Sequence, residues 1–183
     1  MSKKRMILGS GKLYLIPYVD IVPEVDEICV EDNLFGNIKG GATLEYTPTF
    51  YEAKDDLGIL TKTIITEESA LLKSGVMTID GNTLKTLCDT GRITEDTTKG
   101  RRILKIGGID NAQGARYVIC FHHSDPIDGD IWVLIVGQNQ AGFSLAFAKD
   151  SETVIDAEFK CLAQDTEGTL IQYIEEDSSL LNP

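Results

Sequence analysis

The sequence predicts a mainly β fold, a two-sheet antiparallel β sandwich or half-barrel with one short flanking α-helix and long extended loops. Three observations support this prediction. Apolar and polar residues alternate with a period of two over much of the chain, which is typical of half-buried strands. Turn-forming sequences of hairpin length separate the alternating segments. Only one segment has apolar residues at convincing helical spacing.

The length of the chain bounds its organisation. Its 183 residues are typical of one domain, so we expect a single domain over residues 1–183. A core of this size buries roughly 70% of the surface that the unfolded chain exposes, which is enough for unaided folding. Less regular segments are expected to be an arm-like N-terminus at about 1–10, a long hairpin loop at about 48–62, a flexible loop at about 90–100 and a C-terminal arm at about 176–183.

A hairpin is predicted in the first half of the chain. One face of its first strand is expected to carry Ala42, Leu44, Tyr46 and Phe50, and the other Thr43, Glu45, Thr47 and Thr49. Pro48 cannot donate to a strand ladder, which indicates an edge or a bend. The β-branched run at 60–66 is the expected return strand, and the polar segment 52–58 predicts a long loop between them.

Six further segments predict strands, and one predicts a helix. The run 131–136 is apolar on both faces and is expected to be the most buried strand. The helix is expected over residues 80–89, with N-cap candidates at its start and Gly91 as its terminator. Residues 92–100, rich in threonine and charge, predict an exposed loop. The other strands are expected at 101–106, 116–122, 143–148, 153–162 and 169–175.

The charge of the chain argues against nucleic-acid binding. The net charge is −12, whereas a protein that grips phosphates needs a positive surface. Residues 150–183 contain nine acids and one base, so −8 of this charge lies there. These acids alternate with strand-forming residues, which indicates an ordered surface. No apolar run approaches the ~20 residues that span a bilayer, and no export signal is recognised, so we expect a cytoplasmic product without membrane insertion.

The four cysteines agree with that compartment. Cys29, Cys88, Cys120 and Cys161 are scattered and form no CxxC pair. An even number of cysteines permits disulfides. In a chain without an export signal, however, we expect four reduced thiols that are mostly small core residues.

The only two histidines, His122 and His123, are adjacent. Neighbouring residues on a strand point to opposite faces, and no second Cys/His cluster completes the four ligands of a zinc site. Ser124 follows them without an acid that we can assign to it, and no spacing selects a catalytic pair of carboxylates. The segment 9–12, GSGK, lacks the rest of a phosphate-binding loop. We therefore expect no enzyme activity, no metal and no cofactor.

Three stretches resemble one known family. Residues 36–48, GNIKGGATLEYTP, are similar to the segment that leads into the long hairpin of siphophage-type tail tube proteins. Residues 159–170, FKCLAQDTEGTL, resemble the closing hairpin of that family, and residues 11–15, GKLYL, resemble its first strand. Order and spacing match over most of the chain. Cys161 stands where such proteins often have alanine, and the histidine pair has no counterpart that we can name.

The resemblance implies a structural virion protein of a bacteriophage tail. A β domain with a flanking helix would close into a hexameric ring, and stacked rings would form the tail tube through which the genome leaves. The protein would be found in the virion tail, and in the host cytoplasm during assembly. The implied partners are further copies of the chain, a tape-measure protein, a tail terminator and tail-tip or baseplate proteins, while DNA passes without specific binding.

Two sets of residues are expected to serve such a tube. A lumen wall that carries carboxylates would repel DNA phosphates, so that the duplex slides. The candidate lumen-facing residues are Thr43, Glu45, Thr47, Asp156 and Glu158. A polar loop that orders only against a neighbouring ring would limit premature polymerisation. The candidate inter-ring and inter-subunit residues of that loop are Tyr51, Glu52, Lys54, Asp55 and Asp56.

Alternatives stay open at this point. A monomeric β-sandwich module that binds carbohydrate or peptide would need an exposed aromatic cluster, but the single Trp132 falls in the most apolar strand. A hydrolase with an acidic site would need a selected carboxylate pair and a pocket. Within the tube hypothesis, the sequence does not separate a non-contractile tail from a contractile tail or a phage-derived bacteriocin particle.

Overall fold

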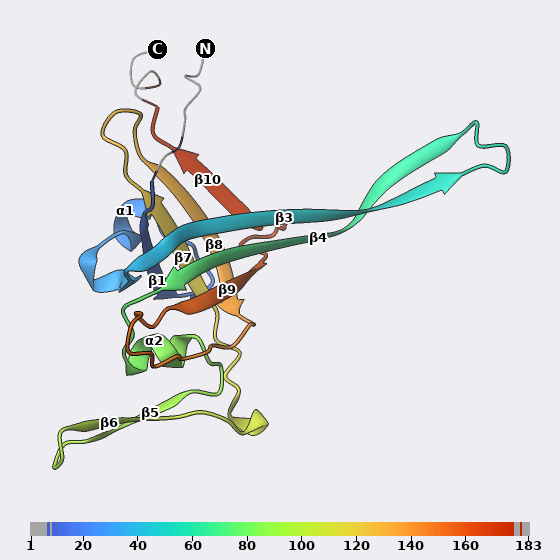
Figure 1. Ribbon diagram of the computed structural model, residues 1–183. Helices are drawn as coiled ribbons and strands as arrows, with labels where there is room; N and C mark the ends of the chain where they lie inside the picture. The colour runs from blue at the N-terminus through green and yellow to red at the C-terminus, as the bar shows by residue number, and fades with distance from the viewer. Residues whose placement is uncertain (1–6, 8, 178–179, 181–183) are drawn as a thin grey trace.

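The computed structural model describes residue 7, residues 9–177 and residue 180 (Figure 1). The fold is mainly β, with 47% strand and 10% helix, and the large sheet is antiparallel. This confirms the predicted fold class. The predicted arms at about 1–10 and 176–183 lie largely outside the described residues. No helix among the described residues is long and apolar enough to cross a bilayer.

Eight strands form the large sheet. They are β1 (Lys12–Pro17), β2 (Leu34–Gly36), β3 (Ile38–Lys54), β4 (Thr61–Val76), β7 (Tyr117–His123), β8 (Ile131–Asn139), β9 (Ile155–Leu162) and β10 (Ile171–Glu175). In space the order is β2-β1-β7-β8-β9-β4-β3. β8 pairs with β10 through residues 131–135 and with β9 through residues 136–139. β10 and β9 therefore lie one after the other along β8.

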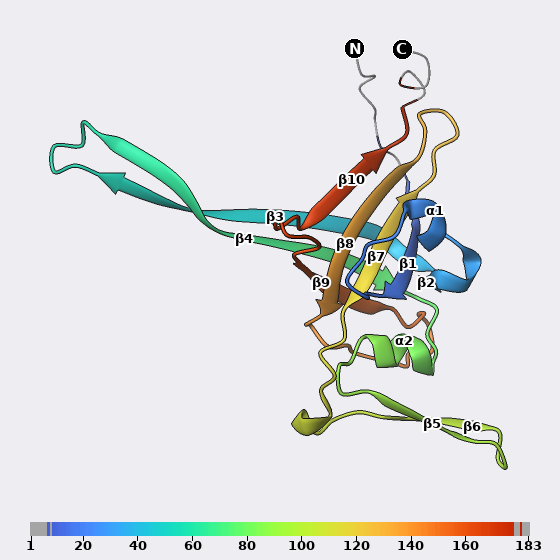
Figure 2. The ribbon, with the colours of Figure 1, turned by 180° about the vertical axis from the view of Figure 1, so that it is seen from behind.

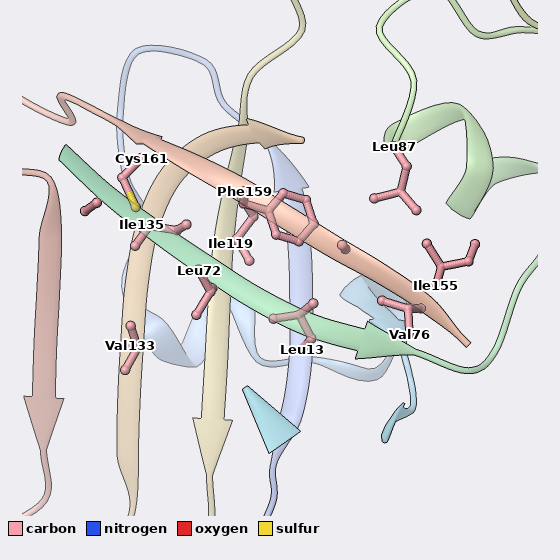
Figure 3. Close-up of a cluster of buried hydrophobic side chains, with 12 residues drawn as sticks. Leu13, Leu72, Val76, Leu87, Ile119, Val133, Ile135, Ile155, Phe159 and Cys161 are labelled. Atoms are coloured by element: carbon pink, nitrogen blue, oxygen red, sulfur yellow. The ribbon is translucent and has the colours of Figure 1, made fainter. Parts of the chain in front are cut away.

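The sheet folds back on itself to give two layers. β4 and β9 cross the face of β1, β7 and β8 (Figures 1 and 3), and the main core lies between the layers. Its larger buried side chains come from both layers: Leu13, Leu72, Val76, Ile119, Val133, Ile135, Ile155 and Phe159. One continuous sheet therefore forms the half-barrel version of the predicted sandwich.

A second core lies on the other face of β1, β7 and β8. Residues 18–33, which include α1 (Val25–Ile28) and the 3-10 helix η1 (Glu31–Asn33), cover this face. Leu134 and Val136 of β8 point into this second core, whereas Val133 and Ile135 point into the main one. The prediction that 131–136 is buried on both faces is confirmed. The sequence did not predict the four-residue α1.

The predicted helix begins where expected. Asp80 is the N-cap of α2 (Gly81–Thr86), and its carboxylate accepts hydrogen bonds from the backbone N–H of Thr83 (2.7 Å) and from the Thr83 hydroxyl (3.0 Å). The cap satisfies an N–H group that the first helical turn leaves without a partner. The helix ends at Thr86 rather than at residue 89. Leu87 follows it and is buried in the main core, so α2 lies against one end of the two layers (Figure 1).

The loop expected at about 90–100 is instead a second hairpin. β5 (Arg92–Asp96) pairs with β6 (Arg101–Lys105), and only the turn between them remains irregular. The Asp96 carboxylate accepts a hydrogen bond from the backbone N–H of Lys99 (3.1 Å), which stabilises this turn. The 3-10 helix η2 (Ile109–Asn111) follows. The prediction was wrong because the segment is highly charged and no residue of β5 or β6 is buried, so its sequence lacks the apolar and polar alternation of a half-buried strand.

Two strand boundaries also differ from the prediction. The long hairpin loop expected at about 48–62 is only six residues, because β3 pairs with β4 as far as Lys54 and Thr61. The backbone N–H of Leu60 donates to the Asp55 carboxylate (2.9 Å) across this turn. The strand expected at 143–148 does not form, and these residues belong to no strand of the sheet. Phe143 and Leu145 pack on the main core without joining a ladder.

Candidate assembly surfaces

The distal part of the β3–β4 hairpin projects far from the two layers (Figures 1 and 2). We call residues 46–69 the hairpin arm. The hairpin is packed on the core up to Leu44 and Ala70, and beyond them nearly every residue of the arm is exposed. Its large apolar side chains are 48% to 80% exposed: Tyr46, Phe50, Tyr51, Leu57, Ile59, Leu60, Ile64 and Ile65. Exposed apolar side chains in such number are typical of an interaction surface.

The arm is apolar on both of its faces. Phe50 pairs with Ile65 across the ladder, and the next pair, Tyr51 with Ile64, points to the opposite face. A two-stranded hairpin that stands alone is marginally stable in water. The arm therefore offers two apolar surfaces for which this chain supplies no cover among its described residues.

The predicted loop residues lie at the end of this arm. Tyr51, Glu52 and Lys54 belong to β3, and Asp55 and Asp56 begin the turn. Lys54 forms an ion pair with Glu52 (Nζ to Oε2, 3.2 Å). The structure thus brings the five together, but it places three of them in a strand rather than in a loop.

Four of the five candidate lumen residues share the outer face of β3, β4 and β9. The ladder aligns Thr43 with Lys73 and Lys73 with Glu158, in one row across the three strands. The Lys73 ammonium lies 3.0 Å from Glu45 and 3.8 Å from Glu158. The hydrogen bond to Glu45 raises the pKa of Lys73.

A shallow hollow of about 350 Å³ opens on this face, and Thr43, Lys73, Asp156 and Glu158 line it. Thr47 lies further along β3, opposite Ser69 on the arm. Sequence reasoning missed Lys73, because its position between two carboxylates depends on the register of three strands. The face is therefore less acidic than the sequence suggested.

Among the described residues, charged side chains of opposite sign gather at the two ends of the molecule. Residues 92–105 contain five bases and two acids in a chain whose net charge is −12. Arg101, Ile103 and Lys105 alternate along β6 and share one exposed face of the β5–β6 hairpin. Arg101 and Lys105 form no ion pair with any described residue, whereas Arg102 pairs with Glu95 (3.0 Å). We call Arg101, Ile103 and Lys105 the basic ridge.

Acids gather at the opposite end, where β10 ends beside the turn between β7 and β8 (Figures 1 and 2). The turn between β7 and β8 meets the end of β10 there: the backbone N–H of Glu176 donates to the Asp130 carbonyl (2.9 Å), and the Asp130 N–H donates to the Glu176 carboxylate (3.1 Å). We call this group the acidic end: Asp125, Asp128, Asp130, Glu175, Glu176 and Asp177.

Asp130 also organises the histidine segment. Its carboxylate binds the His122 ring (Nε2 to Oδ2, 2.7 Å) and accepts from the Ser124 hydroxyl (3.0 Å). Burial opposes ionisation of Asp130, but these hydrogen bonds hold its pKa below the ordinary value. The expectation that Ser124 has no acid is therefore wrong. His122 and Ser124 each bind the Asp130 carboxylate. An activated serine nucleophile requires a hydrogen bond between serine and histidine, and here the carboxylate is the partner of both.

His122 and His123 point to opposite faces, as predicted. His122 stacks on Trp132 (ring centroids 5.1 Å apart), and His123 is buried with its Nδ1 at 2.7 Å from the Ser10 carbonyl. Trp132 is partly covered by this stacking and is not part of an exposed aromatic platform. In the part of the chain that the structure describes, no three His, Cys, Asp or Glu side chains are grouped as metal ligands.

A second hollow, of about 600 Å³, lies between β2 and α2, and two carboxylates line it, Asp32 and Asp80. Asp80 is engaged in capping α2. The backbone hydrogen bond from Thr83 lowers the pKa of Asp80, whereas a general acid needs a raised pKa. Asp80 is therefore suited to capping α2 and not to the general-acid role of an acidic hydrolase.

No protein-family model matches the chain, and no curated protein matches it in sequence.

Proposed function

We propose that the chain is a structural virion protein that assembles into stacked hexameric rings, and that these rings form the tail tube through which phage DNA passes into the host. The observation that supports this most strongly is the hairpin arm. It is long, projects from the core and exposes apolar side chains on both faces. A monomer gains little from such an arm, whereas neighbouring subunits in a ring or stack would bury it on both sides.

The distribution of charge supports a directional stack, in which the rings are joined head to tail. The basic ridge and the acidic end lie at opposite ends of the molecule (Figure 1). Contacts between unlike surfaces of identical subunits repeat head to tail, so each ring would present its basic ridges to the acidic ends of the next.

The outer face of β3, β4 and β9 is the proposed lumen wall. Glu45, Asp156 and Glu158 would repel the DNA phosphates. Lys73 lies between Glu45 and Glu158, which neutralise it, so it would not hold a phosphate as a free lysine would. We propose the same partners as the resemblance implies: the tape-measure protein, the tail terminator and the tail-tip or baseplate proteins. The protein would reside in the virion tail and, before assembly, in the host cytoplasm.

Negative-stain electron microscopy of the purified, concentrated protein tests this function. We expect six-fold rings or hollow tubes, either spontaneously or after addition of a tail-tip complex. Protein that stays monomeric and also fails to extend such a complex would overturn the proposal. It would favour the binding-module alternative, whose aromatic side chains would then be those of the arm, Tyr46, Phe50 and Tyr51.

A further inference from the structure

Two cysteines are in contact in the second core. The Sγ atoms of Cys29 and Cys120 lie 3.5 Å apart, although 91 positions separate the two residues in the chain. Either thiol is able to donate the hydrogen bond between them. All four cysteines are free thiols, and Cys120 and Cys161 are buried, as the sequence predicted for core residues.

The two thiols belong to different parts of the fold. Cys120 is in the middle of β7 and is fully buried (0% exposed). Cys29 is half-buried at the C-cap of α1, in the segment that covers β1, β7 and β8. This helix has four residues and no side-chain cap at its N-terminus. Cys29 can therefore approach Cys120 by a local adjustment of the covering segment, without a change in the sheet.

We propose that Cys29 and Cys120 form an oxidation site, at which a small disulfide such as glutathione disulfide converts the two thiols into an intramolecular disulfide. The Cys29 thiolate attacks one sulfur of glutathione disulfide, the S–S bond of the oxidant breaks, and one glutathione thiolate leaves. The Cys120 thiol then loses its proton, attacks the Sγ of Cys29 and expels the second glutathione. Two protein thiols are oxidised, one glutathione disulfide is reduced, and the two thiol protons end on the two glutathiones.

The environment of each thiol fits this order of steps. Cys29 is the one that solvent reaches, and the hydrogen bond from Cys120 lowers its pKa. The same hydrogen bond and, after it, burial raise the pKa of Cys120, which favours the protonated thiol until the mixed disulfide forms beside it. The sulfurs need to close from 3.5 Å to about 2.05 Å, the length of a disulfide bond.

The disulfide would fasten the covering segment to the centre of the sheet. It would also close a long loop and so restrict the unfolded chain, which stabilises the folded state. Thiols persist in a reducing cytoplasm and oxidise outside it. The link would therefore form only where the surroundings are oxidising. The inference is carried by the contact of the two sulfurs and holds whether or not the protein forms a tube.

The test is oxidation of the purified full-length protein in glutathione disulfide without denaturant. We expect an intact mass lower by two hydrogen atoms, a peptide that joins Cys29 to Cys120, and a urea midpoint raised by roughly 2 M. Cys29→Ser should abolish all three changes, while Cys88→Ser and Cys161→Ser should leave them intact. In Cys120→Ala, Cys29 should accumulate as a stable glutathione adduct, because no second thiol resolves it.

Three outcomes would overturn the proposal. The first is wild-type protein that keeps four thiols or stops at the glutathione adduct of Cys29. The second is a disulfide between any other pair of cysteines in the folded protein. The third is a Cys29–Cys120 link that appears only after unfolding in urea, since native proximity would then not be its cause.

Discussion

A Cβ atom on Gly137 would lie 2.4 Å from the backbone carbonyl oxygen of Lys160. Gly137 is in β8 and pairs with Cys161 of β9, at the place where the sheet passes from one layer to the other. Contact this close leaves no room for a side chain, so any larger residue would force the two strands apart.

Gly137→Ala should therefore destabilise the fold. We expect the free energy of unfolding to fall by about 3 kcal/mol, because the obstructing atom belongs to the backbone and cannot move aside. Urea denaturation followed by circular dichroism measures the change. Gly81→Ala is the matched control, since its Cβ would meet side chains and no backbone atom: the flexible Arg102 at 3.1 Å and Ile93 at 4.0 Å. Equal stability of the two variants would contradict this account of the crossing between β8 and β9.

The sequence predicted those elements whose burial leaves a pattern in the chain. The run 131–136 is apolar throughout because Leu134 and Ile135 face two different cores. Asp80 is recognisable as a cap because capping depends on residues three positions apart. The ribbons were harder to predict. β5, β6 and the distal parts of β3 and β4 have solvent on both sides, so polar and apolar residues are not sorted by face.

The candidate sites depend on contacts that no local pattern shows. Lys73 meets Glu45 and Glu158 only because the register of three strands aligns them. The contact of Cys29 with Cys120 brings together a short helix and a strand that are distant in sequence. The Ser124–Asp130 pair is closer in the chain and could have been foreseen, because both residues lie in the short segment between the strands expected at 116–122 and 131–136.

Asp80→Ala should cost about 1 kcal/mol of unfolding free energy near neutral pH, since it removes the cap of α2. The hydrogen bond from the Thr83 backbone is the largest cause of the lowered pKa of Asp80 in the folded protein. A carboxyl group with a lowered pKa stabilises the fold above its unfolded pKa of about 3.9, and this contribution is lost as the pH falls through the folded value. The difference between wild type and variant should therefore be full at about pH 7 and shrink below about pH 4.

Asp80→Asn is the control, because asparagine also caps helices and should lose less stability than alanine. Urea titrations of the three proteins across this pH range test the prediction. A difference between wild type and Asp80→Ala that stays constant into acid would show that the ionised carboxylate is not the stabilising group.

Cys29 should be alkylated by iodoacetamide at lower pH than Cys88. The hydrogen bond with Cys120 lowers the pKa of Cys29, whereas burial raises the pKa of Cys88. Only the thiolate reacts, so the rate at Cys29 should reach half of its plateau at the lower pH. Cys120→Ala should shift the Cys29 profile upward and leave that of Cys88 in place. Peptide mass spectrometry gives both rates, and coincident profiles would refute the assignment.

Assembly should depend on charge at the basic ridge. The double substitution Arg101→Glu with Lys105→Glu should slow the stacking of rings, since it places acid against the acidic end of the next subunit. Added salt should slow wild-type stacking for the same reason, because it screens exposed charges. Light scattering follows the rate. Lys149→Glu, in an exposed loop, is the control for Arg101→Glu alone, because each of these single substitutions changes the net charge by two. Equal effects of substitution at the basic ridge and at Lys149 would show that the ridge is not part of the stacking contact.

The two faces of the hairpin arm can be tested separately. Phe50→Ser with Ile65→Ser changes one face, and Tyr51→Ser with Ile64→Ser changes the other, because these residues are cross-strand pairs. All four side chains are 48% to 59% exposed, so each double variant should keep its free energy of unfolding within about 0.5 kcal/mol of wild type. Both should lose assembly under conditions in which wild type forms rings or tubes, since a neighbouring subunit is expected to bury each face. If one double variant assembles normally, only the other face of the arm is a subunit contact. If both double variants assemble normally, the arm is not the assembly surface, and the main support for the proposed tube is lost.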